Sequence, residues 1–440
     1  MNFVFFDSSD NCGGIENLLI EMSNYLANLD NKVFFITYYN DTIYHKVLTN
    51  KPNVKIININ YRRDIQYLNK KEIANIKRLC LTNLEGSNKN NEKWYVITPY
   101  FLNFQFAMAI FGDDNRFKLM HLWGHPEDWK NTLRISGNGG MTKRIIKNNK
   151  YYYQKKLIKI LYEKNADFYG GRVVPVFNDW YYGLEIEPKA IYTLPIKSID
   201  EALVNYNINT KKREFNIIWC GRFDYWKNEA IIHISEVLEK LSQLYTDIVI
   251  NYDLIGSGEK NNTNYVKNSI NTNKVHVRYL GMVKSDELSK ILSKYDLGIG
   301  MGLSVKKMGQ VGVPAIVIDS VDKEHIDWLK ADWLFNTKEG DAGDGYYFHI
   351  AGKGIEGRKS LYELLDEVFK QPLLLNDYSK KCMCYVKENY SEERQIQQIV
   401  NCVINSKFSG INYPIYHRNM ILRIIYRSYQ KYKLVKRKLK

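Results

Sequence analysis

Cysteines and long apolar runs are scarce in this sequence, and each scarcity excludes a class of protein. The six cysteines are scattered over 440 residues. Cys382 and Cys384 make one short pair, without the second pair or the nearby histidines of a zinc site. We interpret the cysteines as reduced thiols, mostly in the core. No apolar run approaches the roughly 20 residues that cross a bilayer, and the N-terminus begins as a strand without a charged leader, so we expect a cytoplasmic protein.

The order of apolar segments predicts an α/β protein with two domains. At 440 residues the chain is too long for one ordinary core. Strand-like runs alternate with helical runs, which is the rhythm of parallel sheets covered by helices. The rhythm breaks at about 195–214, so we expect domains over 1–200 and 201–400 and a tail over 401–440; segment 338–360 is predicted to be a loop. The expected strands lie at 1–6, 32–39, 55–61, 93–100, 117–124, 215–221, 248–256, 275–281, 297–302 and 314–319.

The net charge of +15 predicts a polyanionic partner: nucleic acid, an anionic membrane or a phosphorylated small molecule. Segment 418–440 carries nine of the cations and no acid, and removing those nine charges leaves +6 for the rest. No RRM, KH, zinc-finger or helix-turn-helix signature accompanies the charge. We therefore expect no nucleic-acid partner.

Two basic segments interleave cations with apolar residues, as a helix lying at a membrane surface does. They are 143–164, which has one acid, and 418–440. We predict that both hold the protein at the inner leaflet of the cell membrane, since each cation near an anionic leaflet contributes about 1 kcal/mol. The alternatives are solvated helix faces, or a tail helix that packs back on the first domain.

A glycine pair, Gly13 and Gly14, stands between the first strand and a helical run. Glycines at this position let the backbone pass close to a ligand and leave free helix N–H groups pointing at it. The alternative is a tight turn that requires a positive φ angle.

In the second half, Arg222 and Lys227 follow the strand that ends at Gly221. Ligands of open α/β sheets bind beyond the carboxyl ends of strands, where two cations neutralise a diphosphate leaving group without a metal ion. Solvated surface charges are the alternative. Further glycines end the next strands, and a helix is expected to begin near Ser304 with its N–H groups facing the same place. The expected donor-binding residues are Gly13, Gly14, Arg222, Lys227, Gly256, Gly281, Gly302, Ser304, Val305 and Lys307.

The first half places His125 just beyond a strand, where a neutral imidazole can donate or accept a proton near pH 7. We expect His121, inside the strand, to be a core or pocket residue. Glu127 and Asp128 could orient His125 or meet an acceptor hydroxyl, or belong to a charged loop. Trp129 could pack on a sugar ring or in the core.

In these residues the sequence resembles the GT-B glycosyltransferases of the large retaining family 4. The resemblance covers residue 3 to about 320 and depends on the joint order of weak motifs. It implies two Rossmann-like doubly wound domains, a nucleotide-sugar in the cleft between them, catalytic roles for His125, Arg222 and Lys227, and no metal or other cofactor. The matching motifs are Gly13-Gly14-Ile15-Glu16, Gly221-Arg222 with Lys227, Gly256-Ser257-Gly258, Val277 to Gly281, Tyr295-Asp296, and Gly302-Leu303-Ser304 through Gly312-Val313-Pro314.

The sequence departs from the family pattern at two positions. Lys307 stands where the family has a glutamate that contacts the ribose, and Ile299 stands at the place of its earlier glutamate. A cation cannot accept the ribose hydroxyl hydrogens. The resemblance implies a retaining hexosyltransferase, UDP-sugar favoured, that acts on a glycan or lipid-linked oligosaccharide in bacterial surface polysaccharide synthesis. The departure leaves open a noncatalytic subunit of an active transferase.

Overall fold

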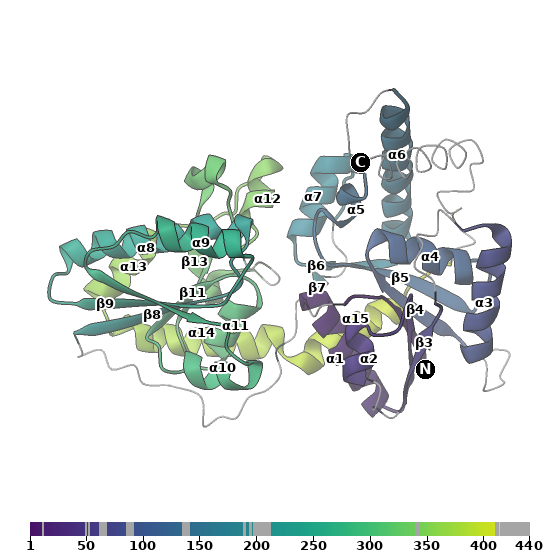
Figure 1. Cartoon of the computed structure of the whole chain (residues 1–440), viewed down its shortest axis with the longest axis horizontal. Helices are drawn as coiled ribbons and strands as arrows, with labels where there is room; N and C mark the ends of the chain where they lie inside the picture. Colours follow the sequence, from purple (N-terminus) through teal and green to yellow (C-terminus); the bar gives the residue numbers. More distant parts are fainter. Residues whose placement is uncertain are drawn as a thin grey trace. The chain divides into compact units, whose positions relative to one another are not determined.

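The chain forms two compact units in the computed structural model (Figure 1). Unit 1 comprises Met1–Tyr192 and Ile396–Lys440, and unit 2 comprises Thr193–Gln395. Residues 396–409 therefore pack with the first unit, although we expected the second domain to run to 400 and a separate tail to begin at 401. The structure describes residues 1–10, 13–48, 51, 53–60, 68–84, 92–133, 141–187, 191–192, 196, 213–338, 341, 343–409 and 413. Most of the predicted linker, and segment 418–440, lie outside these residues.

Unit 1 is built on a seven-stranded parallel sheet with the order β3-β2-β1-β4-β5-β6-β7. Every residue of β1 and of β4 is buried, because helices cover both faces of a parallel sheet and its central strands become apolar throughout. The strands are β1 (Asn2–Phe6), β2 (Lys32–Thr37), β3 (Val54–Asn58), β4 (Trp94–Pro99), β5 (Phe117–Trp123), β6 (Asp167–Gly170) and β7 (Ile191–Tyr192).

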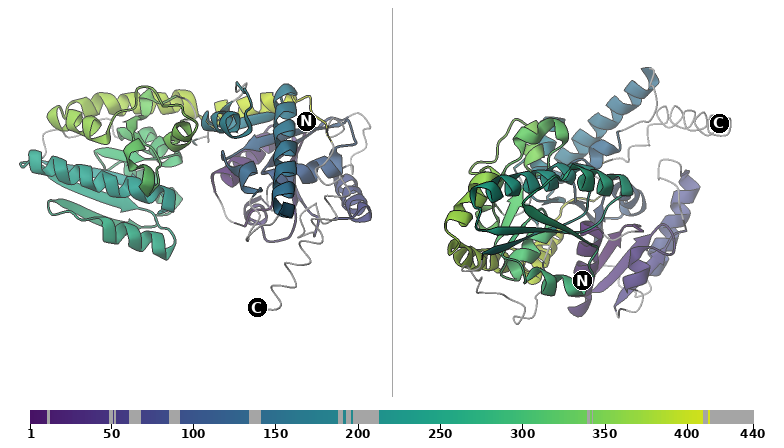
Figure 2. Two further views of the ribbon diagram at one scale, coloured as in Figure 1. Left: turned by 90° about the horizontal axis from the view of Figure 1, so that it is seen from above. Right: turned by 60° about the vertical axis from the view of Figure 1, so that its left-hand side comes forward.

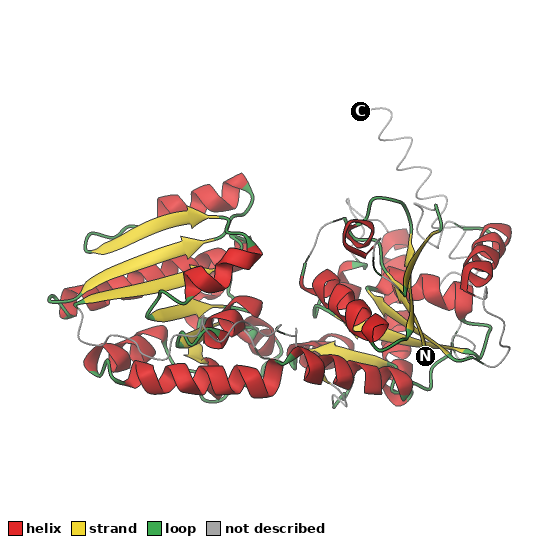
Figure 3. Ribbon diagram, turned by 90° about the horizontal axis from the view of Figure 1, so that it is seen from below, coloured by secondary structure: helices red, strands yellow, loops and turns green. Residues whose placement is uncertain are grey.

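Helices surround this sheet (Figure 3). Helix α15 carries the chain back to it from unit 2. The returning segment is tied to β5, since the N–H of Leu119 donates to the Phe408 carbonyl at 3.1 Å. The helices are α1 (Gly14–Asn28), α2 (Ile43–Leu48), α3 (Lys70–Leu84), α4 (Phe101–Phe111), α5 (Asp128–Asn131), α6 (Met141–Glu163), α7 (Val173–Tyr182) and α15 (Glu392–Ile404).

Unit 2 has a six-stranded sheet with the order β10-β9-β8-β11-β12-β13, in which only the edge strand β13 is antiparallel among the described pairs. The edge strand β10 alternates exposed and partly buried residues, whereas β11 and β12 are wholly buried. The strands are β8 (Glu214–Cys220), β9 (Val249–Ile255), β10 (Val275–Gly281), β11 (Leu297–Gly300), β12 (Ala315–Ile318) and β13 (Ala331–Trp333).

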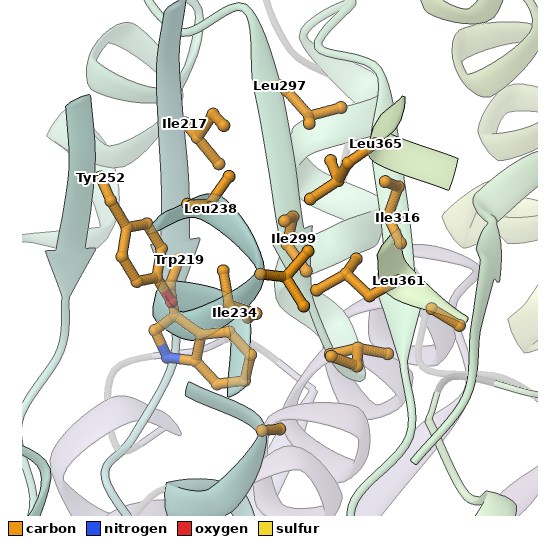
Figure 4. Packing of buried hydrophobic residues seen from close by; sticks show 14 of the residues in the cluster. Ile217, Trp219, Ile234, Leu238, Tyr252, Leu297, Ile299, Ile316, Leu361 and Leu365 are labelled. Atoms are coloured by element: carbon orange, nitrogen blue, oxygen red, sulfur yellow. The ribbon is translucent and has the colours of Figure 1, made fainter. Parts of the chain in front are cut away.

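Helices lie on both sides of the unit 2 sheet (Figure 2). One core cluster joins β8, β9 and β11 to α8 and α13 through side chains such as Trp219, Tyr252 and Leu365 (Figure 4). Segment 338–360 contains the helix α12, so the prediction of a loop there is wrong. The helices are α8 (Tyr225–Leu244), α9 (Lys260–Ser269), α10 (Ser285–Leu292), α11 (Leu303–Gln310), α12 (Gly345–Ile350), α13 (Leu361–Lys370) and α14 (Leu374–Tyr390).

Both units are thus doubly wound α/β sheets of the Rossmann-like kind, and the predicted fold class is confirmed. Each first strand, β1 or β8, lies inside its sheet, where the strand order reverses direction. The loops that follow these strands are therefore the places where a ligand of such a sheet binds. Among the described helices, none is long and apolar enough to cross a membrane.

Candidate functional site

The loops at the carboxyl ends of β8, β9 and β10 are joined by backbone hydrogen bonds. The N–H of Gly221 donates to the Ile255 carbonyl at 2.9 Å, and the N–H of Gly256 donates to the Gly281 carbonyl at 2.8 Å. The N–H of Phe223 donates to the Ser257 carbonyl at 3.0 Å. The ends of these three strands therefore form one connected rim.

Two positions of this rim, 256 and 258, require glycine because neighbouring backbone atoms occupy the space of a side chain. At Gly256, where φ is +141°, an added Cβ would lie 1.9 Å from the Gly221 carbonyl oxygen, and at Gly258 one would lie 2.0 Å from the Phe223 oxygen. Loop packing thus explains the Gly256 motif without a ligand, and the role of Gly256 in donor binding stays a prediction. Gly281 and Gly302 differ: their φ angles are +72° and +64°, and no described atom lies within 4 Å of an added Cβ.

Arg222 and Lys227 occupy the β8–α8 end of this rim. Arg222 is exposed over 75% of its side chain and lies 3.4 Å from the Asp224 carboxylate. Lys227 is half-buried, with its Nζ 4.5 Å from the centre of the Trp226 ring. Burial, together with the charge of Arg222, lowers the pKa of Lys227 to about 8. This lysine is poised to gain a counter-ion, because an anion beside it would restore the pKa of an ordinary ammonium group.

Lys307 belongs to the same electrostatic neighbourhood. The pKa of the Cys220 thiol is raised to about 11 by burial, and the charges of Lys307 and Lys227 both oppose that rise. The two lysines, from α11 and α8, therefore act on one point at the end of β8. Three cations, Arg222, Lys227 and Lys307, gather at the end of the strand on which the sequence placed two.

Helix α11 begins beside these cations, with Gly302 as its N-cap. The Ser304 hydroxyl donates back to the Met301 carbonyl at 2.8 Å, and the Val305 side chain is fully buried. Val305 can therefore contact a ligand only through its backbone, and the Ser304 hydroxyl is already engaged. The free N–H groups at the first turn of α11 are what this segment offers to an anion.

In unit 1, Gly13 is the N-cap of α1 and has extended backbone angles. Neither Gly13 nor Gly14 has a positive φ, so the alternative of a turn that demands one is wrong. The N–H of Gly13 donates to Glu16 Oε2 at 2.9 Å, and an added Cβ at Gly13 would lie 2.7 Å from that same oxygen. Gly13 thus leaves room for the Glu16 carboxylate to cap the helix, and both glycines are exposed.

Glu16 leads to a buried polar network that the sequence reasoning missed. The Ser9 and Tyr100 hydroxyls donate to Glu16 Oε1 at 2.8 and 3.0 Å. The Ser9 hydroxyl oxygen also lies 2.8 Å from Asp7 Oδ2, and Asp7 Oδ1 accepts the Asn103 amide at 2.8 Å. Burial raises the pKa of Asp7. Polar residues immediately after β1 and β4 are the sequence signal that could have indicated these groups.

His125 and Asp128 lie beyond β5, next to the start of α1. The His125 Nδ1 accepts the N–H of Glu127 at 3.1 Å, so the neutral ring carries its proton on Nε2. Neighbours that desolvate the ring lower the pKa of His125. Burial, with a smaller contribution from the charge of Glu16, raises the pKa of Asp128 to about 7. An added Cβ at Gly124 would lie 2.5 Å from Ile15 Cδ1, which fixes how closely this loop meets α1.

Two predicted acceptor-side residues have other partners. Trp129 is fully buried and donates its Nε1–H to His121 Nε2 at 2.8 Å, so it cannot offer a ring face to a sugar. Burial lowers the pKa of His121 to about 3, which keeps this ring a neutral acceptor, and its assignment to the core is confirmed. Glu127 pairs with Lys130 at 2.7 Å. Asp128 is therefore the acidic residue of this loop whose carboxylate is held by backbone groups instead of a lysine.

Each unit thus carries one group of candidate residues. Unit 2 brings Arg222, Lys227 and Lys307 to the end of β8, and unit 1 brings Glu16, His125 and Asp128 to the start of α1. In the described part of the chain no cluster of three or more His, Cys, Asp or Glu residues could hold a metal ion. Whether the reaction uses a metal is a separate question, and metal independence stays a prediction.

No protein-family model matches the chain, and no curated protein matches its sequence. Several solved structures do resemble it. A glycosyltransferase from Rickettsia africae is 14% identical, with a TM-score of 0.59 over 91% of this chain and 97% of its own. Anabaena HepE, solved with UDP and glucose, is 11% identical, with a TM-score of 0.55 over 92% and 99%. A variant of S. aureus TarM, solved with fondaparinux, alpha-GlcNAc-glycerol and UDP, is 11% identical, with a TM-score of 0.53 over 92% and 100%. At these identities the likeness establishes the fold, which is GT-B.

Proposed function

We propose that the protein is a glycosyltransferase that moves a sugar from a nucleotide diphosphate sugar to a hydroxyl group. The observation that carries this proposal is the convergence of Arg222, Lys227 and Lys307 on the end of β8, beside the first turn of α11. A cluster of cations and helix N–H groups is complementary to a diphosphate. The UDP bound to HepE and TarM supports a UDP-sugar as the donor.

Charge stabilisation is the main catalytic task in this proposal. As the sugar–oxygen bond breaks, negative charge accumulates on the departing diphosphate, and cations already in place stabilise it without reorganisation. We propose retention of configuration, with a hexosyl unit transferred by attack on the face that the diphosphate leaves. A diphosphate oxygen can then accept the acceptor's proton.

The unit 1 residues have complementary roles in this reaction. The Nε2–H of His125 is a neutral donor suited to a sugar hydroxyl or to the transition state. The Asp128 carboxyl, with its pKa near 7, can orient the acceptor hydroxyl near neutral pH by accepting its hydrogen bond. Gly13 and Gly14 leave the first N–H groups of α1 accessible to the donor.

We propose a glycan or lipid-linked oligosaccharide as the acceptor, in the assembly of a bacterial surface polysaccharide. The basic segments 143–164 and 418–440 motivate this acceptor, because cations at a helix surface attract anionic lipid headgroups. The protein would then act at the inner leaflet as a peripheral protein. Segment 418–440 lies outside the described residues, so its part in attachment depends on the sequence alone.

A second candidate function is a noncatalytic GT-B subunit that binds glycan or stabilises an active transferase. The observation that favours it is the loss of both acidic positions near the ribose: Lys307 is a cation, and Ile299 is fully buried in the core. Such a protein would keep the fold while losing nucleotide affinity.

A donor screen separates the two functions. UDP-Glc, UDP-Gal, UDP-GlcNAc and GDP-Man are incubated with the full chain, and nucleotide release is measured with and without EDTA, alongside calorimetric binding of UDP and GDP. The transferase proposal expects release from one donor, unchanged by EDTA, and nucleotide binding that Arg222→Ala weakens. Absence of any nucleotide binding at millimolar concentration would leave the noncatalytic function.

A further inference from the structure

Helix α6 contains the basic segment of unit 1, and its apolar face is already occupied. Leu157, Ile158 and Leu161 are fully buried, and so is the polar Gln154. At its other end, the Lys150 ammonium donates to the Thr132 carbonyl at 2.8 Å, which ties α6 to the segment after α5. The interpretation of this segment as a helix that lays its apolar face on a membrane is therefore wrong. Any membrane contact must use the outward face.

The outward face of α6 exposes large apolar side chains as well as cations. Ile145 is 42% exposed and Tyr152 is 62% exposed. They are seven residues apart, so they lie on the same side of the helix, two turns from each other. Lys156 and Lys159 continue the same stripe and are also exposed.

Helix α7 extends this surface with aromatic rings. The rings of Tyr152 and Tyr151 are 5.6 Å apart, those of Tyr151 and Tyr181 are 5.8 Å apart, and those of Tyr181 and Trp180 are 6.1 Å apart. The Tyr151 hydroxyl donates to the Tyr181 carbonyl at 3.0 Å, and Figure 1 shows α6 and α7 near each other. We name Tyr151, Tyr152, Trp180 and Tyr181 the aromatic ridge. Trp180, at 46% exposed, ends it.

The charge beside the aromatic ridge is mainly positive. The acids near it are Glu163, which lies 4.0 Å from Lys159, the half-buried Asp179, and Glu127, whose partner Lys130 lies 5.4 Å from the centre of the Tyr181 ring. Further acids, Glu185 and Glu187, follow α7. The exposed cations of α6 and its C-terminal end are Arg144, Lys147, Lys156, Lys159 and Lys164.

We propose that the aromatic ridge, together with Ile145, is the surface by which unit 1 enters the headgroup layer of an anionic bilayer. Trp and Tyr prefer the membrane–water interface, because their rings are apolar and their N–H and O–H groups remain hydrated. The flanking lysines face the lipid phosphates. This inference rests on the membrane attachment proposed above, but the contact is made by the aromatic ridge instead of the apolar face of α6. Since Lys150 links α6 to Thr132, a lipid-linked acceptor would arrive in the neighbourhood of Asp128.

Exposed rings among cations also suit single-stranded nucleic acid, on which bases stack. The bilayer is favoured because aliphatic Ile145 belongs to the same face and offers no stacking surface. Nucleic acid is therefore an outcome of the test.

The experiment is vesicle flotation of the full chain with phosphatidylcholine alone and with phosphatidylcholine that contains phosphatidylglycerol. Near an anionic surface each lysine contributes about 1 kcal/mol, which is about fivefold in binding. Three proteins are compared: the native chain, the double variant Tyr152→Ala/Trp180→Ala, and Leu244→Ala, which removes an apolar side chain 58% exposed on unit 2. We expect binding to the anionic vesicles only, a loss of about tenfold or more in the double variant, and no change in Leu244→Ala. Brominated lipid should quench part of the tryptophan emission, and Trp180→Phe should remove that part.

Circular dichroism and calorimetric UDP binding show whether each variant is folded and whether the donor site is intact. Native binding that the double variant retains would overturn the ridge as the contact. Absence of native binding to anionic vesicles would overturn membrane attachment altogether, and retained UDP binding would keep the transferase proposal. If the double variant instead loses binding to a 20-nucleotide RNA while vesicle binding is unchanged, the ridge is a nucleic-acid surface.

Discussion

Asp128 Oδ2 accepts the backbone N–H of His125 at 3.2 Å, so the carboxyl group and the histidine of unit 1 are held in one tight turn. The histidine ring is fixed from its other side by the N–H of Glu127. Any change in the charge of Asp128 therefore acts directly on the backbone that presents His125.

Asp128 should make activity depend on pH near neutrality. Burial raises its pKa to about 7, so the carboxylate form grows as the pH rises through 7. If the carboxylate orients the acceptor hydroxyl by accepting its hydrogen bond, kcat/KM for the acceptor should rise between about pH 6 and 8. Asp128→Asn should lower kcat by about 10²-fold or more and flatten this limb, with UDP affinity unchanged. A full-rate Asp128→Asn enzyme would exclude the proposed role.

The contribution of Asp128 to folding stability should fall as the pH rises, whereas its contribution to activity should grow. Because the folded pKa of Asp128 lies above its ordinary value, the group favours folding below about pH 4, and this advantage is lost as the pH rises through 7. We expect the Tm difference between Asp128→Asn and the native chain to move in favour of the variant as pH increases over that window. Melting curves at pH 4.5, 6 and 8 measure it. A constant difference would show that the carboxyl is not buried in solution.

Lys227 should give donor binding an alkaline limit. Its pKa is lowered to about 8, chiefly by burial, so the free protein loses this charge as the pH rises through 8. UDP affinity should therefore fall between pH 7.5 and 9. Lys227→Ala should weaken UDP binding by about 10- to 100-fold, since a charged hydrogen bond contributes roughly 1.5–3 kcal/mol. Lys227→Arg should keep binding and remove the pH dependence, and calorimetry at several pH values checks both.

Gly256 and Gly281 should tolerate alanine differently. Gly256→Ala combines an unfavourable φ of +141° with a Cβ 1.9 Å from the Gly221 oxygen, so the rim must open. We expect a loss of about 3 kcal/mol or more in the free energy of unfolding, comparable to other core overpacking combined with backbone strain. In Gly281→Ala the added Cβ meets no neighbour, and only the unfavourable φ of +72° should lower the free energy of unfolding, by about 1–2 kcal/mol. Denaturant unfolding compares the pair, and equal losses would contradict the loop-packing explanation.

Variants at Lys307 distinguish two hypotheses: that this lysine helps to bind the diphosphate, or that it replaces an acid that once contacted the ribose. If it assists the diphosphate, Lys307→Gln should weaken UDP binding by about five- to tenfold, because the other two cations remain in place. Lys307→Glu should be worse still. Improved nucleotide binding in Lys307→Glu would instead indicate that an acid has been lost from a ribose contact, which favours the noncatalytic subunit.

Local sequence was sufficient to predict the longer strands, and the loops that hold Arg222, Lys227 and His125. Buried parallel strands read as continuous apolar runs, so β1, β8 and β11 were visible. The short strands β6, β7 and β13 were missed, because two to four residues carry too little pattern. Helix α12 was also missed, since Gly and Asp surround it.

The sequence by itself determined the order of the elements and placed Arg222 and Lys227 after a strand. The reason is that the spacing of apolar residues, and the residue at which a strand ends, depend on neighbours in the chain. Only the tertiary structure decided which side chains remain available. It buried Trp129 against His121, engaged Ser304 with its own loop, and brought Lys307 into reach of Cys220. The physical reason is that burial and electrostatic potential are set by residues far apart in the chain. The tertiary structure also showed that glycine at 256 makes room for the backbone of Gly221. It left the side chains of Tyr152 and Trp180 exposed on α6 and α7.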